Sequence, residues 1–361
     1  MGGAGRSVNG DDVKGINSET SPPVSASSSE CTNASVLFEE REKAFWYIGE
    51  LVVERKVDEG YRLNDQALEG LRAIFDKYLE IPSLLDHHIV ELVSTLTDAA
   101  CSILAKRATS PPKNGNDDEE EKAETIIEDE KNSKDGKRSQ DYDFFWKSPL
   151  PRILSAIYAL SKVRGRKRVQ KFLPHQVENL EPVLNCLILL DDLVRQEQEK
   201  LNNNSNMVIG HGAANSEITG GPQLWESTYT MWNWMEILGK VPFDCEVVIN
   251  ASQIKQLFRL ATISLSETGP SREMAASCLA RWLTRPDLEE SSFRSSFQQW
   301  SLEVLEEHVG KSKTSTAIPS MQNTIFTTMG ILRTLVTILK ISTAQRQQVL
   351  VSIATAPCRY L

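Results

Sequence analysis

The stretch IVELVSTLTDAACSIL, residues 89–104, decides the fold class of this chain. Its apolar residues recur every three or four positions, which is the spacing that lines one side of an α-helix with about 3.6 residues per turn. A half-buried strand would instead alternate every second residue. The stretch therefore predicts an amphipathic helix, whose apolar side is formed by Ile89, Leu92, Val93, Leu96, Ala99, Ala100, Ile103 and Leu104.

The same spacing recurs in residues 150–160 and 331–339. No Asn-Gly pair is flanked by alternating segments, and strands do not alternate with helices along the chain, so neither hairpins nor a parallel sheet are predicted. The chain is therefore predicted to be all-α. The apolar period and the turn residues place helices over residues 36–56, 64–80, 83–107, 149–163, 166–173, 178–199, 223–238, 251–267, 271–284, 287–307, 317–341 and 344–355.

Short turns join most of these helices, which indicates successive antiparallel pairs. HEAT and armadillo repeats take about 40–47 residues each. By that measure the chain predicts an α-solenoid of about six HEAT- or armadillo-like helix pairs. A compact helical bundle is the alternative, because no internal sequence repeat is strong enough to decide between the two.

Three polar segments interrupt the helices. Each contains too little apolar surface to offset the entropy of ordering, so we expect a disordered tail and two long loops. These are residues 1–34, rich in Gly, Ser and Pro, the acidic insert 108–143, and the Asn- and Gly-rich loop 201–222. Between them the helical repeats are predicted over residues 35–107, 144–200 and 223–361.

The charge of the chain argues against several classes of partner. The 361 residues carry a formal net charge of −9, and much of it lies in the acidic insert. Bulk attraction to nucleic acid or to an anionic membrane is therefore not expected. The N-terminus lacks the apolar core of a signal peptide, and the longest apolar run is too short to cross a bilayer. The expected location is the cytoplasm, without membrane insertion.

Signatures of catalysis and of metal binding are absent from the sequence. The six cysteines form no CxxC pair, and neither HExxH nor GxSxG occurs, so no zinc site, cofactor or nucleophile is predicted. The GKS triplet at residues 310–312 lacks the first glycine of a phosphate-binding loop, because Leu305 stands at that position. Adjacent His87 and His88 do not converge on a helix, so Asp86 is expected to cap a helix and to leave one imidazole exposed. We predict that the protein is not an enzyme.

A basic ridge stands out in this acidic chain. It consists of Lys162, Arg164, Arg166, Lys167, Arg168 and Lys171. A solvated helix face and a docking surface for an acidic protein partner are both consistent with it. A nucleic-acid patch is the third interpretation, but no aromatic residues interleave the charges as single-strand binders require. We therefore expect no nucleic-acid binding.

Two further motifs are expected to be mainly structural. The aromatic residues Trp225, Tyr229, Trp232, Trp234 and Phe243 predict core packing, with at most one indole left for a partner.

The second motif is Thr284, Arg285, Pro286 and Asp287. Pro286 is expected to end one helix and Asp287 to cap the next, which makes the motif a tight turn. Arg285 is expected to pack on a neighbouring repeat.

Four blocks of sequence resemble the tubulin-folding cofactor D family, in the same order. KVRGRKRVQKFLPHQVENLEPVL, residues 162–184, resembles the family's KVRGYK, FPHEV and EPVL segments. RAIFDKYLEIPSLLDHHIVEL, residues 72–92, and REMAASCLARWLTRPD, residues 272–287, are similar to two others. The fourth block joins a Trp-Glu-x-x-Tyr motif at residues 225–229 to VPFD at residues 241–244. Arg166 and Thr228 depart from the family pattern.

The resemblance implies a HEAT-repeat chaperone of the cytoplasm and the microtubule cytoskeleton. Such a protein captures β-tubulin and assembles the αβ heterodimer with tubulin-folding cofactors C and E and a small Arf-like GTPase. The resemblance also implies GTPase-activator activity, with the hydrolysis occurring on tubulin and the small GTPase. Because family members are several times longer, we expect this chain to be an N-terminal part, truncated at its C-terminal end. The alternative is a generic HEAT-repeat scaffold for another acidic partner.

Overall fold

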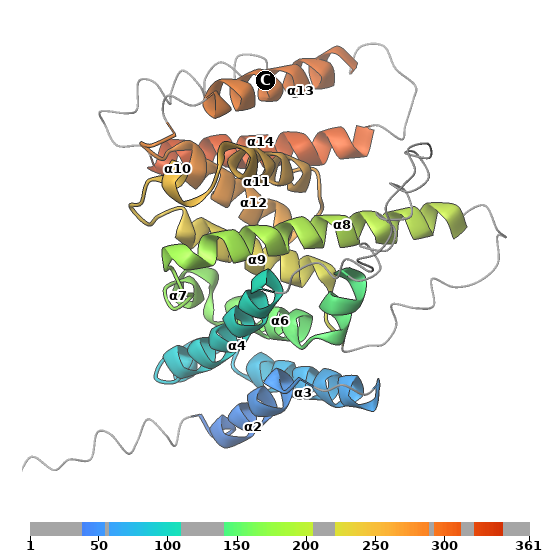
Figure 1. Ribbon diagram of the computed structural model, residues 1–361, viewed down its shortest axis with the longest axis vertical. Coiled ribbons are helices and arrows are strands. Elements are labelled where there is room, and N and C mark those ends of the chain that lie inside the picture. Colours follow the sequence, from blue (N-terminus) through green and yellow to red (C-terminus); the bar gives the residue numbers. More distant parts are fainter. Residues whose placement is uncertain are drawn as a thin grey trace, which may run out of the picture.

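Antiparallel pairs of helices, stacked along one axis, make up the molecule (Figure 1). The computed structural model describes residues 38–54, 58–109, 141–204, 221–288, 292–311 and 321–341, and these residues contain no strand. The five pairs are α2 (Arg41–Val52) with α3 (Asp58–Lys77), α4 (Ile89–Thr109) with α6 (Leu150–Arg164), α8 (Leu180–Asn204) with α9 (Leu224–Leu238), α11 (Ala251–Ser264) with α12 (Pro270–Leu283), and α13 (Phe293–Lys311) with α14 (Met321–Ile341).

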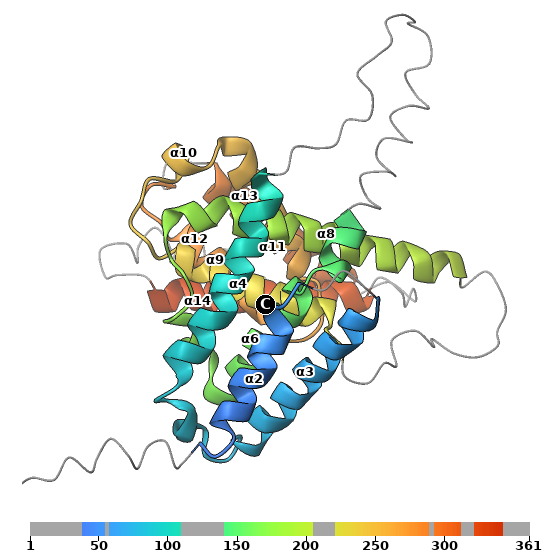
Figure 2. The same cartoon turned by 60° about the horizontal axis from the view of Figure 1, so that its bottom comes forward.

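The pairs form two layers. The second helices of the pairs, α3, α6, α9, α12 and α14, each pack on the next, and we call them the second-helix layer. The first helices α2, α4, α8 and α11 likewise pack each on the next, and we call them the first-helix layer. Figure 1 shows the stack rising from α2 and α3 at the bottom to α13 and α14 at the top, and Figure 2 shows α2 and α3 from below. The predicted all-α solenoid is thus confirmed.

One continuous apolar core runs through the stack. Its largest fully buried side chains are Trp232, Trp234 and Trp282. The indole nitrogen of Trp234 donates to the carbonyl of Pro174 at 2.6 Å, and that of Trp282 donates to the carbonyl of Met235 at 3.2 Å. The indole nitrogen of Trp232 donates to the hydroxyl of Ser264 at 3.2 Å, so each of these three buried indoles keeps a hydrogen-bond partner.

The helix boundaries follow from local chemistry. At the start of α11, Asn250 accepts a hydrogen bond from the backbone N–H of Gln253 at 2.9 Å, and the Gln253 side chain accepts from the backbone of Asn250. This reciprocal arrangement satisfies two free donors of the first turn. Helix α6 ends at Gly165, whose φ of +92° lies in a region that favours glycine. The chain can therefore turn sharply there into the short helix α7 (Arg166–Gln170).

Several boundaries differ from the sequence-based ones. Helix α3 begins at Asp58 instead of residue 64, because the prediction relied on an apolar period that its polar first turn does not show. Helix α8 extends to Asn204, four residues into the predicted loop 201–222, and α4 extends to Thr109. The short helix α10 (Cys245–Val248) was not predicted at all. The tail 1–34 and the predicted helix 344–355 lie outside the described residues.

The connections between successive pairs lie together on one side of the stack. The described residues of these connections are 78–88, 165–179, 239–250 and 284–288, and we call this side the turn edge. It is marked in Figure 1 by α7 and α10, both on the left. Most of the predicted acidic insert and of the Asn-rich loop, residues 110–140 and 205–220, lies outside the described residues. Helix α8 ends at the opposite edge of the stack, on the right of Figure 1. Among the described residues, no helix has the length and apolar character needed to span a bilayer.

Candidate functional site

The turn edge brings together segments that are far apart in the sequence. It carries Asp86 from the first connection, the basic ridge from the end of α6 and the second connection, Phe243 from the third and Arg285 from the fourth. These positions lie in the four blocks quoted in the sequence analysis, residues 72–92, 162–184, 225–244 and 272–287. The turn edge is therefore the candidate site for a partner.

Two arginines of the basic ridge face inward and join neighbouring pairs. Arg164 makes two parallel hydrogen bonds to the carboxylate of Asp86, and its side chain is only 14% exposed. The Arg164 guanidinium holds the pKa of Asp86 below its ordinary value through these hydrogen bonds, although burial opposes the change. The prediction that Asp86 caps a helix is therefore wrong, because its carboxylate is bound by Arg164. Beside it, His87 is exposed and His88 is half-buried.

Arg166 is also bound within the fold. Its guanidinium donates to Glu236 of α9 at 2.6 Å and to the hydroxyl of Ser277 of α12 at 3.3 Å. Lys162, by contrast, pairs with Asp76 at 3.1 Å with both side chains about half exposed, so this pair contributes little to stability. Three of the six ridge cations are thus already neutralised by carboxylates of the protein.

The other three ridge cations remain available on the surface. Lys167, Arg168 and Lys171 are exposed, and none of them makes a salt bridge with any residue that the structure describes. We call these three the turn cations. Their charge is concentrated on α7 and the residue after it, at the middle of the turn edge. The six cations cannot be told apart in the sequence, because the carboxylates that bind Lys162, Arg164 and Arg166 lie 70 to 86 residues away.

The motif of residues 284–287 connects the fourth turn to the third. Arg285 is 6% exposed and donates to the backbone carbonyls of Gly239 at 3.1 Å and Val241 at 2.9 Å. The guanidinium also lies over the ring of Phe243, 4.5 Å from its centre. These contacts place Arg285 on the neighbouring pair, as its expected structural role requires. Thr284 closes the end of α12 by donating to the carbonyl of Arg281 at 2.9 Å, while Pro286 is exposed.

Asp287 has a different role from the predicted one. It does not cap α13, which begins only at Phe293. Its carboxylate accepts from the backbone N–H of Cys245 at 2.9 Å and pairs with Arg285 at 2.8 Å. Burial alone would raise the pKa of Asp287, but the hydrogen bonds from Arg285 and Cys245 outweigh it and lower the pKa to about 2. Asp287 therefore stays ionised and fixes α10 at the turn edge.

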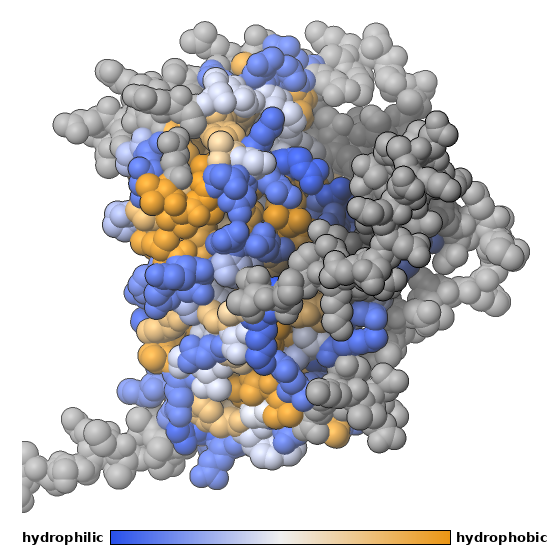
Figure 3. Space-filling view, viewed as in Figure 1, coloured by the Kyte–Doolittle hydropathy of each residue, from blue (hydrophilic) through white to orange (hydrophobic). Residues whose placement is uncertain are grey.

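Apolar side chains are exposed on the same edge. Leu79 and Ile81 of the first connection are 45% and 58% exposed, and Val247 of α10 is 82% exposed. Figure 3 shows an apolar patch on the left of the molecule at the level of α10. Sequence reasoning missed these residues, because α10 was not predicted and Ile81 was assigned to a turn. The turn edge thus combines free positive charge with exposed apolar surface.

The aromatic passage is buried except for the half-buried Phe243 and the exposed Trp225. Trp232 and Trp234 are at most 1% exposed, whereas Trp225 is 40% exposed. The prediction of mainly core packing with one indole left over is confirmed. Trp225 contacts Tyr158 edge to face with ring centres 4.9 Å apart, and the neighbouring Glu226 pairs with Arg72 of α3 at 2.5 Å.

Metal chemistry has no evident site in the described part of the chain. No group of three or more His, Cys, Asp or Glu side chains converges there. His88 accepts a hydrogen bond from Arg41 at 3.2 Å, and burial lowers its pKa.

Comparison with known proteins agrees with this architecture. Residues 75–305 match the family model described as tubulin-specific chaperone D-like, ARM repeat. The matched segment begins in α3, ends in α13 and includes all four connections of the turn edge. No solved structure matched the chain. Because the family model covers well over half of the 361 residues, the chain belongs to the tubulin-specific chaperone D-like family of armadillo-repeat proteins.

Proposed function

We propose that this protein is a tubulin-folding chaperone that binds β-tubulin and takes part in assembly and disassembly of the αβ heterodimer. The observation that carries this proposal is the family match over residues 75–305, which contains the whole turn edge. The further partners in the proposal are tubulin-folding cofactors C and E and a small Arf-like GTPase. The proposed location is the cytoplasm and the microtubule cytoskeleton.

In this proposal the protein acts by binding and not by catalysing a reaction of its own. A stack of helix pairs offers a long, continuous surface, and such solenoids bind partners over several repeats at once. GTPase-activator activity would then be expressed on the bound tubulin and the small GTPase. The protein would supply orientation to its partners, with no nucleotide site of its own.

The turn edge is the surface that we assign to the acidic client. The turn cations attract a negatively charged protein at long range, and the exposed Ile81 and Val247 offer apolar area for the contact itself. Because the charge is local, it operates even though the chain as a whole is acidic. High salt is therefore expected to slow association with the client.

Capture of β-tubulin from a cytosolic extract, followed by reconstitution with the purified subunit, tests the assignment. The triple variant K167E/R168E/K171E is expected to weaken capture about tenfold or more, because each lost charge contact is worth up to about 1 kcal/mol. The matched control is K106E/K147E/K200E, which makes the same change in net charge at the edge opposite to the turn edge. The ion pairs of Lys106 and Lys147 are exposed, so the control is expected to remain folded.

The possible results separate the proposals. Equal capture by K167E/R168E/K171E and the wild type would show that the turn cations do not contribute to the interface. Failure of the wild type to capture tubulin, with reproducible enrichment of a different acidic protein, would favour the generic HEAT-repeat scaffold instead.

A further inference from the structure

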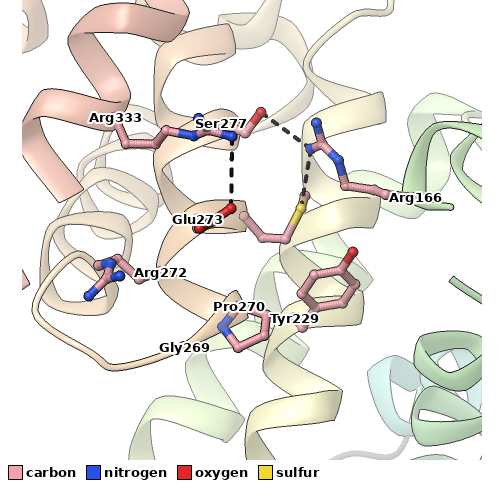
Figure 4. A pocket seen from close by; sticks show the side chains of 9 residues that line it. Arg166, Tyr229, Gly269, Pro270, Arg272, Glu273, Ser277 and Arg333 are labelled. Atoms are coloured by element: carbon pink, nitrogen blue, oxygen red, sulfur yellow. Dashed lines mark hydrogen bonds and ion pairs between the residues drawn. The ribbon is translucent and has the colours of Figure 1, made fainter. Parts of the chain in front are cut away.

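A pocket of about 510 Å³ opens on the second-helix layer, where α7 meets α9, α12 and α14 (Figure 4). Three of these helices each contribute an arginine to its wall: Arg166 from α7, Arg272 from α12 and Arg333 from α14. Tyr229 from α9 also lines the pocket, below Arg166 and beside Pro270 in Figure 4. The volume is within the range of ordinary ligand sites, about 300–1,000 Å³.

Arg166 forms the fixed part of the pocket. Its ion pair with Glu236 at 2.6 Å and its hydrogen bond to Ser277 hold the guanidinium at the wall, with the side chain 28% exposed. Such a side chain has already lost its rotamer freedom, so an anion that binds it does not pay that entropy again.

Arg272 lacks a carboxylate counter-ion among the residues that the structure describes. Its guanidinium has a long contact to the carbonyl of Glu267 at 3.4 Å and lies 5.4 Å from the ring centre of Phe326. Arg152, a buried arginine elsewhere in the fold, is by contrast paired with Asp65 at 2.8 Å. Arg272 therefore places, at the edge of the pocket, a positive charge for which the described residues provide no carboxylate partner.

Arg333 is only weakly compensated. It lies 3.8 Å from Glu273, and the two side chains are 53% and 60% exposed. An exposed pair at this separation is readily exchanged for a better acceptor. The three arginines and the two glutamates Glu236 and Glu273 leave the pocket with a net positive charge.

Two neutral features add to this potential. Burial raises the pKa of Tyr229 to about 12, so its hydroxyl remains a hydrogen-bond donor at neutral pH. The pocket also contains Gly269 and Pro270 at the start of α12, where the helix dipole favours an anion. Both features favour a negatively charged ligand.

We propose that this pocket binds a carboxylate-bearing segment of a partner protein. Guanidinium groups match carboxylates in planar, bidentate hydrogen bonds, and two of the three here are available for such contacts. A peptide is favoured over a small free anion because the positive surface continues beyond the pocket. Arg166 begins α7, the same short helix that carries the exposed Lys167 and Arg168. An acidic segment can thus extend from the pocket to the turn edge.

Binding of fluorescent hexaglutamate to the full chain, followed by anisotropy at constant ionic strength, tests this inference. The variant R272Q/R333Q is expected to bind about tenfold more weakly, since two charge-assisted contacts are lost. The matched control K255Q/R259Q removes two exposed cations from α11, in the first-helix layer, and is expected to bind like the wild type. E273Q is expected to bind about threefold more tightly, because it removes a competing carboxylate. A merely structural role for these side chains would not produce a gain.

Several results would overturn the inference. Unchanged binding by R272Q/R333Q, with an unchanged unfolding midpoint, would show that the peptide does not bind in the pocket. An equal loss in K255Q/R259Q would show nonspecific attraction, and equal binding of hexaglutamine would show that carboxylates are not recognised. Displacement by inorganic phosphate but not by acetate would assign the pocket to phosphoryl groups instead.

The inference rests on the proposed function only for the identity of the partner. Hexaglutamate binding that depends on the pocket would stand even if the wild type captured no β-tubulin. Conversely, if hexaglutamate does not bind in the pocket, tubulin capture through the turn edge is still tested separately by K167E/R168E/K171E.

Discussion

The guanidinium of Arg164, the last residue of α6, binds the carboxylate of Asp86 in the connection between α3 and α4. The two residues are 78 positions apart, and their side chains are 14% and 31% exposed. The pair therefore ties the second turn of the solenoid to the first. A two-pronged contact of this kind fixes orientation as well as distance.

Breaking this pair is expected to destabilise the first two helix pairs. We expect Arg164→Ala and Asp86→Ala each to lower the free energy of unfolding, with a coupling energy of about 1–2 kcal/mol in a double-mutant cycle. Arg164→Lys is expected to recover only part of it, since a lysine cannot form the two parallel bonds. Urea denaturation measures all three variants. A coupling energy near zero would contradict the assigned contact.

Acid is expected to weaken the contact between the third and fourth turns through Asp287. Its ordinary pKa of 3.8 falls to about 2 in the folded protein. Because the folded pKa is the lower one, the stabilisation of about 2 kcal/mol is complete above pH 4 and is lost as the pH falls towards 2. Urea denaturation across this range should show a shallower acid loss for Asp287→Asn than for the wild type. Parallel pH curves for both proteins would exclude this role of Asp287.

Two helical glycines are expected to respond oppositely to alanine. A Cβ at Gly49 of α2 would meet no atom within 4 Å, whereas one at Gly330 of α14 would lie 2.7 Å from the carbonyl oxygen of Leu265. We expect Gly49→Ala to raise the free energy of unfolding by about 0.5–1 kcal/mol through better helix propensity. Gly330→Ala should lower it by about 1–3 kcal/mol, because α14 must move away from the end of α11. The same sign for both variants would contradict the close packing at Gly330.

The carboxyl of Glu267 is expected to make the protein less stable at alkaline pH. Burial raises its pKa from 4.5 to about 7, although the hydroxyl of Ser264 donates to it at 3.2 Å. Because the folded pKa is the higher one, the protonated form is favoured in the folded state. Stability is therefore lost as the pH rises from about 4.5 through about 7.

Replacing this carboxyl by a neutral amide tests the sign. Glu267→Gln should raise the unfolding midpoint more at pH 8 than at pH 5, because only at the higher pH does the wild type bury a charge. Thermal unfolding at both values measures the difference. An equal effect at the two pH values would mean that the side chain is solvated in the folded state.

The helices themselves could be predicted from local sequence. The apolar period of residues 89–104 corresponds to α4, and the glycine that ends α6 is visible at residue 165. The boundaries that failed were those with no local signal. The start of α13 is one example, because Asp287 was assigned to its cap while the fold uses that carboxylate at Cys245.

The candidate site could be predicted only in part. The basic ridge was visible as a cluster, but its division into bound and free cations was not. Arg164 and Lys167 look alike in sequence, and they differ because only Arg164 meets a carboxylate from another turn. Likewise, no spacing in the sequence indicates that Arg166, Arg272 and Arg333 line one pocket.

The sequence by itself determined the all-α class, because helix formation depends on neighbours three and four residues apart and those neighbours are in the sequence. Stacking of the helix pairs into a solenoid, which the sequence left open against a compact bundle, was decided by the tertiary structure. The tertiary structure alone decided which cations pair with carboxylates inside the fold and which stay exposed for a partner. Ion pairing depends on distance in space. Here the stacking of the helix pairs brings together residues that are 70 or more positions apart in the sequence.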